Sequence, residues 1–160
     1  HTMTNTPITS TLTDEQKTIT GNALQQTLVD LIDLSLVAKQ AHWNVVGRNF
    51  RSVHLELDEL VTVSREFTDQ AAERATAIGV SPDGRAETVA KTAGTTGFGD
   101  GWTSDTEVIT SIVENLKAVI AGLRTRIDET EEADPVTQDL LISFAAKLEQ
   151  LHWMWQAQIA

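Results

Sequence analysis

Two histidines and three carboxylates in the first half of the chain have the residue types of a metal site. Four of them fall in one helical pattern that runs from about residue 50 to 78, and these are His54, Asp58, Asp69 and Glu73. At 100° per residue, the three acids lie at about 40°, 60° and 100° from His54, so all four share one helix face. Together with His42, they offer the imidazole and carboxylate ligands that suit iron, manganese, zinc or a harder cation. We therefore interpret the face as metal-binding rather than merely solvated.

The spacing along this helix requires a second chain. Asp58 and Asp69 are separated by about 16 Å at 1.5 Å per residue, which is too far for both to hold one ion. The midpoint between His54 and Glu73 lies near residues 63 and 64. The midpoint between Asp58 and Asp69 lies at the same place. An antiparallel copy about a two-fold axis at that point would set His54 opposite Glu73. The pattern therefore predicts two mixed clusters, one at each end of a symmetric dimer.

Composition limits the possible classes of protein. The chain has 160 residues, 41% of them hydrophobic, which is typical of one compact domain. It has no cysteine, so disulfides and thiolate metal sites are excluded. The balance of 12 basic against 23 acidic residues gives a net charge of −11, which suits cations and opposes phosphates. With no long apolar run and no signal peptide before the first helix, we expect a cytoplasmic protein without membrane contact.

Four long helical patterns predict an all-α fold. The first begins at the capping box Thr13–Gln16 and runs to about residue 45, and the second covers about 50–78. The third opens at a second capping box, Ser104–Glu107, and the fourth at Pro135 after Asp134 as N-cap. Between the second and third lies a long glycine-rich connection in which 86–92 forms a short helix. With no credible strand, this describes a ferritin-like four-helix bundle with a long crossover between its second and third helices.

A longer motif carries a resemblance to a known family. The string His-Trp-Asn-x-x-Gly-x-x-Phe-x-x-x-His-x-x-x-Asp spans 42–58, and Asp69-Gln-Ala-Ala-Glu-Arg follows it. This string resembles the Dps family, the DNA-binding proteins from starved cells, which are mini-ferritins. The resemblance extends over nearly the whole chain, as far as Leu151–Trp155. It implies a Dps domain over 14–160, preceded by a flexible segment 1–13 whose His1 and Thr2 come before Met3 and are interpreted as a cloning remnant.

The resemblance also implies an assembly and an activity. It implies a hollow homododecamer with ferroxidase centres between two-fold-related subunits, where His42, His54 and Asp58 come from one subunit. Asp69 and Glu73 come from its neighbour. The implied cofactor is a di-iron centre together with a ferric mineral core, and the implied partners are Fe(II) and hydrogen peroxide, the preferred oxidant. We therefore expect an iron-storage and detoxification protein that oxidises Fe(II) to Fe(III) and protects DNA and the cell from oxidative damage.

Three further features have two interpretations each. Trp43, beside His42, either intercepts stray oxidising equivalents or fills the dimer interface. The cluster 152–155 serves packing and subunit contacts rather than a second redox site. An acidic turn lies where the third helix meets the fourth, with acids Glu129, Glu131, Glu132, Asp134 and Asp139. The resemblance places this turn at a three-fold pore that admits iron through Glu131, Asp134 and Asp139, whereas a simple solvated turn with Asp134 as N-cap is the alternative.

The charge pattern opposes the DNA binding that the family name suggests. Between Met3 and Gln16 the chain has no Lys or Arg, and Lys17 is the first. An acidic shell needs flexible cations to reach phosphates, so we expect weak or absent DNA binding. Two alternatives to the ferroxidase stay open: a DNA-compacting protein associated with the nucleoid, and a metal-dependent hydrolase that uses the same ligands to activate water.

Overall fold

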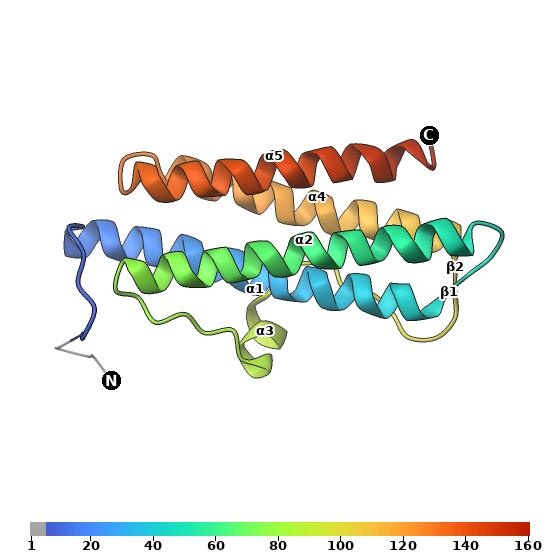
Figure 1. Ribbon diagram of the computed structural model, residues 1–160, viewed down its shortest axis with the longest axis horizontal. Coiled ribbons are helices and arrows are strands. Elements are labelled where there is room, and N and C mark those ends of the chain that lie inside the picture. The colour runs from blue at the N-terminus through green and yellow to red at the C-terminus, as the bar shows by residue number, and fades with distance from the viewer. Residues whose placement is uncertain (1–5) are drawn as a thin grey trace.

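Four long helices form the body of the molecule. The computed structural model describes residues 6–160, in which α1 (Asp14–Asn44) and α2 (Phe50–Ala77) run antiparallel and side by side. α4 (Asp105–Thr130) and α5 (Pro135–Ala157) form a second antiparallel pair (Figure 1). The short α3 (Ala86–Thr92) lies in the connection between α2 and α4, outside the bundle. The all-α bundle, its long crossover and the bounds of the short helix are confirmed.

Local capping sets where the helices begin. Gln16 N donates to Thr13 Oγ1 at 3.2 Å, and Thr13 N donates to Gln16 Oε1 at 2.9 Å. This reciprocal pair satisfies two amides that the first turn of a helix leaves without partners. At α4, Glu107 N donates to Ser104 Oγ at 3.3 Å. α1 and α2 each end one residue before the expected position, at Asn44 and Ala77.

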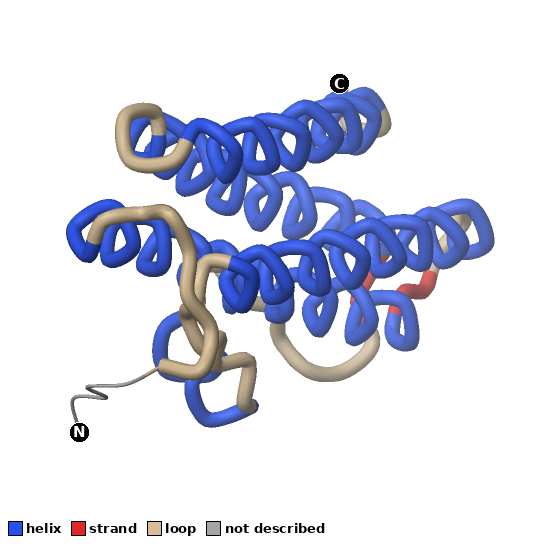
Figure 2. The backbone as a smooth tube through the Cα atoms, turned by 60° about the vertical axis from the view of Figure 1, so that its left-hand side comes forward, coloured by secondary structure: helices blue, strands red, loops and turns tan. Residues whose placement is uncertain are grey.

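The expectation that the chain has no strand was wrong. β1 (Val45–Val46) pairs in parallel with β2 (Thr103–Ser104), with Val45 opposite Thr103. Figure 2 shows this small sheet at one end of the bundle, beside the end of α1. Two residues per strand are too few to produce a visible alternation of polar and apolar side chains, so the pattern gave no signal. The bridge is a backbone contact that joins the α1–α2 turn to the end of the crossover.

Apolar side chains of all four long helices fill the interior. Apolar stripes along α1, α2 and α5 are buried, and Trp155 is only 1% exposed. Phe67 of α2 stacks on Phe144 of α5 with ring centroids 4.4 Å apart, which joins the two helix pairs across the core. None of the helices in the described part of the chain, residues 6–160, is long and apolar enough to cross a membrane.

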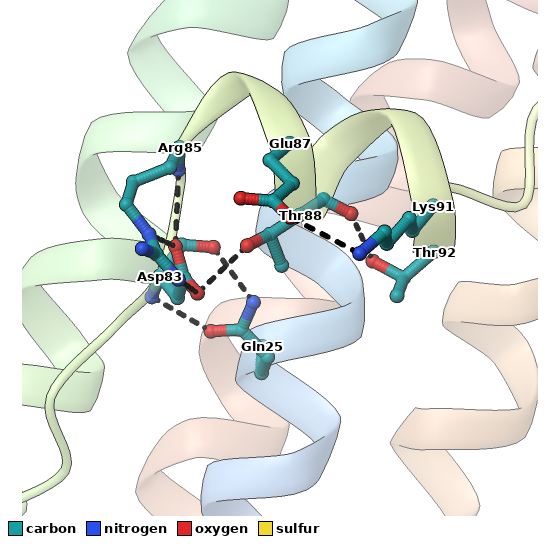
Figure 3. Close-up of polar contacts among 7 residues, drawn as sticks. All are labelled: Gln25, Asp83, Arg85, Glu87, Thr88, Lys91 and Thr92. Carbon is teal, nitrogen blue, oxygen red and sulfur yellow. Dashed lines mark hydrogen bonds and ion pairs between the residues drawn. The ribbon is translucent and has the colours of Figure 1, made fainter.

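The crossover is held against α1 by polar side chains. Gln25 donates to the carbonyl of Asp83 at 2.8 Å and accepts from its amide at 2.9 Å (Figure 3). The Asp83 carboxylate also accepts from Arg85 N and from Thr88 Oγ1, so it ties the start of α3 to the loop before it. The Arg85 side chain donates to the same carboxylate. Its hydrogen bonds are the largest cause, followed by those from Thr88 Oγ1 and Arg85 N, of a pKa of Asp83 far below its ordinary value. α3 is thereby fixed at one height on α1.

The rest of the crossover is anchored by two buried residues. Asp30 of α1 accepts from Gly94 N at 2.7 Å, and Asn115 of α4 accepts from Thr96 N and Gly97 N. Asn115 is fully buried and also donates to the Gly97 carbonyl at 2.9 Å. Gly97 has a φ of +81°, a backbone conformation that other residues rarely adopt. The glycine-rich segment therefore has a defined path despite its composition.

The N-terminal segment is described only in part. Of the flexible segment predicted for 1–13, residues 1–5 lie outside the described residues. Leu12 packs against the hydrophobic core, and the Ile8 carbonyl lies close to Gly79, at the end of α2. A Cβ at position 79 would meet that oxygen at 2.6 Å, and φ there is +84°, so this contact requires glycine.

Candidate metal centre

Antiparallel packing of α1 on α2 brings three of the five expected ligands together. His42 lies in the last turn of α1, while His54 and Asp58 lie in the first turns of α2. His42 is buried, and His54 and Asp58 are half-buried. The site therefore sits at the surface of one chain, at the end of the bundle where the β bridge closes the α1–α2 turn.

The two imidazoles fix each other in place. His42 Nδ1 lies 2.6 Å from the His54 carbonyl, and His54 Nδ1 lies 2.8 Å from the His42 carbonyl. A carbonyl oxygen only accepts, so each Nδ1 carries a proton and donates. The rings stack with centroids 3.7 Å apart, and Phe50 covers the His54 ring at 5.0 Å. In the neutral rings each Nε2 then keeps its lone pair, which is the arrangement that metal-binding histidines use.

Asp58 adds a carboxylate beside these nitrogens. Its Oδ2 lies 3.6 Å from His42 Nε2, and its Oδ1 accepts from Lys39 Nζ at 2.6 Å. The hydrogen bond from Lys39 is the main reason that the pKa of Asp58 lies below its ordinary value, and the histidines add to this. Asp58 is therefore ionised at neutral pH, as a ligand must be. Sequence reasoning missed Lys39, although its position one turn before His42 places it on the same face of α1.

Asp69 and Glu73 do not join this group within one chain. Both are exposed and lie on α2, toward its far end. Within residues 6–160 of one chain, no three His, Asp or Glu side chains converge closely enough to hold a metal ion. His42, His54 and Asp58 thus form a partial ligand set, and its completion by Asp69 and Glu73 of the partner subunit stays a prediction.

Trp43 is oriented away from the core. Its side chain is 62% exposed and lines a surface hollow of about 430 Å³ together with Leu36, Lys39 and Phe98. Arg65 of α2 contributes to the same hollow. An exposed indole next to the partial site is compatible with both interpretations of Trp43, the redox one and the interface one. At the other end of the chain, Trp153 and Met154 are exposed, whereas Trp155 is a core residue.

In the acidic turn, Asp134 has partners inside the chain. Only 4% of it is exposed. Its Oδ1 accepts from Val136 N at 3.3 Å, and its Oδ2 accepts from Thr137 Oγ1 at 2.6 Å and from Arg74 Nη2 at 2.8 Å. Asp134 therefore caps α5, as the alternative interpretation proposed, and its carboxylate is committed to these partners. Glu131 and Asp139 are exposed, and the iron passage through these three acids stays a prediction.

Replacing Asp134 with Asn tests this role through pH. Burial alone would raise the pKa of Asp134, but hydrogen bonds from Thr137 and Arg74 outweigh it and hold the pKa below its ordinary value. A carboxylate whose pKa is depressed in the folded state stabilises the fold at pH above its unfolded-state pKa of about 3.9. This stabilisation is lost as the pH falls through its folded-state pKa. Asp134→Asn should therefore lower stability by about 1–2 kcal/mol at neutral pH, and the difference should shrink as the pH falls below that unfolded value.

Thermal unfolding at fixed protomer concentration, from pH 7 down to pH 3, measures this difference. Asp139→Asn, an exposed acid on the same helix, is the matched control and should change little. A deficit in Asp134→Asn that persisted unchanged at the lowest pH would contradict a role for its charge.

A second buried ion pair also escaped sequence reasoning. Asp30 of α1 and Arg126 of α4 are 3% and 8% exposed, and Arg126 Nη2 donates to Asp30 Oδ2 at 3.0 Å. The two residues are 96 positions apart, so no local pattern could pair them. The pair joins the first and second helix pairs, and through Gly94 it also holds the crossover.

Comparison with known proteins agrees with this architecture. Residues 21–160 match the family model for ferritin, described as a ferritin-like domain. The fold and the match to this family model together define a ferritin-like four-helix protein. The chain is 33% identical over 152 residues to the DNA protection during starvation protein of Mycolicibacterium smegmatis, covering 92% of this chain and 81% of that one. On this similarity and on the structures below, the chain belongs to the Dps family of mini-ferritins.

Solved structures extend the similarity to three dimensions. A Dps of Mycobacterium smegmatis in a tetragonal form superposes with a TM-score of 0.90 at 31% identity, covering 98% of this chain and 94% of that one. A Dps of Microbacterium arborescens in its high-iron form superposes with a TM-score of 0.89 at 30% identity, covering 95% of this chain and 98% of that one. The ferritin-like fold expected from the helical patterns is thereby confirmed.

Proposed function

We propose that this chain is the subunit of a ferroxidase that oxidises Fe(II), preferentially with hydrogen peroxide, at sites shared between two-fold-related subunits. The ferric product is stored as a mineral inside a dodecameric shell in the cytoplasm. Membership of the Dps family and the ferritin-like fold support iron storage and protection from oxidative damage. The observation that carries the proposal is that His42, His54 and ionised Asp58 lie beside one another as a partial ligand set, and that within residues 6–160 neither Nε2 atom is hydrogen-bonded to the backbone.

The residues fit Fe(II) as a substrate. Neutral imidazole and carboxylate oxygen bind Fe(II), and carboxylates favour Fe(III) still more because they neutralise its added charge. Asp58, joined by Asp69 and Glu73 of the partner subunit, would supply three negative charges to each cluster. Two Fe(II) ions lose one electron each, and one peroxide with two protons takes both electrons to give two waters. Paired oxidation of this kind releases no hydroxyl radical.

Anaerobic loading tests the proposal most directly. The assembled protein is loaded with Fe(II) without oxygen, peroxide is added, and the absorbance of the ferric product is recorded. We expect rapid oxidation with about two Fe(II) consumed per peroxide, as a two-electron reduction at paired ions requires. We also expect slower oxidation when oxygen replaces peroxide, because peroxide is the proposed preferred oxidant. Oxidation no faster than in buffer alone would reject the ferroxidase and favour the hydrolase or DNA-compacting alternatives.

DNA protection without DNA binding is a further expected result. Protection needs only that the protein removes Fe(II) and peroxide, and its negative charge of −11 per chain attracts the cation. Stable binding would need a cluster of cations, and the segment between Met3 and Gln16 carries none. Plasmid DNA exposed to Fe(II) and peroxide should therefore stay un-nicked with the protein present, without a gel shift at about 0.15 M salt.

The gel shift tests the absence of DNA binding, and the nicking assay tests the consumption of peroxide. A gel shift that weakened steeply with salt would show that phosphate contacts exist. Nicking at the rate of unprotected DNA, with metal binding intact, would contradict the consumption of peroxide. Asp58→Ala is the matched control, because it removes a ligand without adding a cation and should abolish protection.

A further inference from the structure

His152, near the end of α5, has a ring nitrogen that is enclosed without a partner. Its Nε2 has essentially no accessible surface, and within residues 6–160 it makes no hydrogen bond. Buried side-chain nitrogens are normally hydrogen-bonded, so such an atom needs an explanation. The proposed function does not use His152, which lies on α5 rather than on the two helices that carry the candidate metal centre. The enclosed nitrogen therefore points to a separate property of the fold.

The enclosure suits a neutral imidazole and opposes a charged one. In the neutral ring one nitrogen carries a lone pair instead of a proton, so Nε2 needs no acceptor. A charged ring carries a proton on both nitrogens, and its Nε2–H would be a buried donor without an acceptor in the described part of the chain. Protonation of His152 therefore adds the cost of an unpaired donor to the cost of a buried charge.

The charged groups around the ring do not offset this cost. Glu149, one turn earlier on α5, would favour a charged ring, but its carboxylate already accepts from Arg124 Nε and Nη2, both at 2.8 Å. Burial is the main reason that the pKa of His152 lies below its ordinary value. The Val113 carbonyl of α4 opposes this shift, Lys117 of α4 adds to it, and Glu149 opposes it weakly. A protonated ring would thus be a buried cation beside a second cation.

The end of α5 joins the two helix pairs. Leu151 and Trp155, on either side of His152 in the sequence, are buried in the core, and Gln158 donates to Glu56 of α2 at 2.5 Å. We propose that His152 is an acid-sensitive contact between α4 and α5, at which protonation creates an unpaired buried donor and loosens the end of α5. This inference is independent of the proposed function.

Uncharged variants of His152 test this by their response to pH. The ordinary pKa of histidine, about 6.5, applies to the unfolded chain. Because the folded-state pKa lies below it, the fold keeps its full stability at higher pH and loses stability as the pH falls from about 6.5 toward the folded-state value. From pH 8 down to pH 5, the midpoint of thermal unfolding of the wild-type protein should therefore fall by about 2–4 °C more than that of His152→Gln or His152→Leu.

Amide hydrogen exchange locates the effect in the molecule. At pH 5 the amides of residues 148–157 should exchange about fivefold faster in the wild-type protein than in the two variants, relative to the same comparison at pH 8. Comparison at equal pH removes the intrinsic dependence of exchange on pH. All measurements use metal-free protein at one protomer concentration. The other histidines are present in every variant, so their protonation cancels.

A neighbouring charge gives a second test that leaves His152 in place. Lys117→Met should make the acid-dependent loss smaller, because removal of a nearby positive charge makes protonation of the ring less costly. Lys91→Met is the matched control, since it changes the net charge equally. Lys91 pairs with Glu87 at 3.1 Å on the exposed surface of α3, so its removal should leave the loss unchanged (Figure 3).

The outcomes decide the role of His152. A larger acid-dependent loss in the wild-type protein than in both His152 variants supports the proposal. An equal loss in the wild type and in either variant, with circular dichroism showing that variant folded at pH 8, overturns the proposal and leaves the proposed function intact. If neither His152 variant folds, a loss in Lys117→Met as large as that in Lys91→Met overturns it, and a smaller loss supports it.

Discussion

Mixing Asp58→Ala subunits with Glu73→Ala subunits should restore about a quarter of the wild-type rate of Fe(II) oxidation. Each variant alone should lose at least about 100-fold, because each lacks a ligand in every cluster. Random mixing makes half of the dimers mixed, and one of the two clusters in a mixed dimer regains every ligand. Asp58 and Glu73 lie too far apart on α2 to complement each other within one chain.

The rate is measured by ferric absorbance after the subunits have been unfolded and reassembled together. A mixture of Asp58→Ala with His54→Ala is the matched control. Both residues belong to the same half of the site, so every cluster in that mixture still lacks a ligand and no activity should return. Equal behaviour of the two mixtures, with mixed dimers demonstrated by mass, would argue that each chain builds its own site.

Replacing Arg126 with Met should lower the free energy of unfolding by about 3–5 kcal/mol. The substitution leaves Asp30, which is 3% exposed, without its cationic partner. Burial lowers the pKa of Arg126, although Asp30 opposes this, so the guanidinium is held in the interior by its pairing. The interaction joins α1 to α4, and its loss should also loosen the crossover at Gly94.

Denaturant unfolding at a fixed protomer concentration gives the size of this effect. Arg124→Met is the matched control, since Arg124 pairs with Glu149 at 2.8 Å on the surface, where an ion pair contributes little. The double variant Asp30→Asn with Arg126→Met should recover part of the loss, because no buried charge remains. Similar effects of the Arg124 and Arg126 single variants would contradict a structural role for the buried pair.

Features encoded locally were predictable, and features made by packing were not. The capping box at Thr13, the N-cap at Asp134 and the short helix 86–92 depend on residues a few positions apart, so the sequence patterns indicated them correctly. The β bridge joins positions 58 apart through backbone atoms alone, and no side-chain pattern records it.

The candidate site shows the same division. Helical spacing placed His54 and Asp58 on one face, and the motif added His42, which the structure brings beside them. The exchange of hydrogen bonds between each Nδ1 and the other histidine's carbonyl depends on the approach of two helices. Lys39 and Arg126 acquire their partners only through that packing. Completion of the site by Asp69 and Glu73 depends on a second chain, and it stays a prediction.

The β bridge also has a consequence for the order in which the chain acquires its structure. Asn49, at the start of α2, donates to Asp105 of α4 at 2.8 Å, and β1 and β2 pair beside this contact. The α1–α2 hairpin has local contacts and can form early. The turn between His42 and His54 gains its contacts with β2 and Asp105 only after the crossover has closed a loop of more than 50 residues. We therefore expect the end of the hairpin that carries the candidate site to become fixed later in folding than the rest of the hairpin.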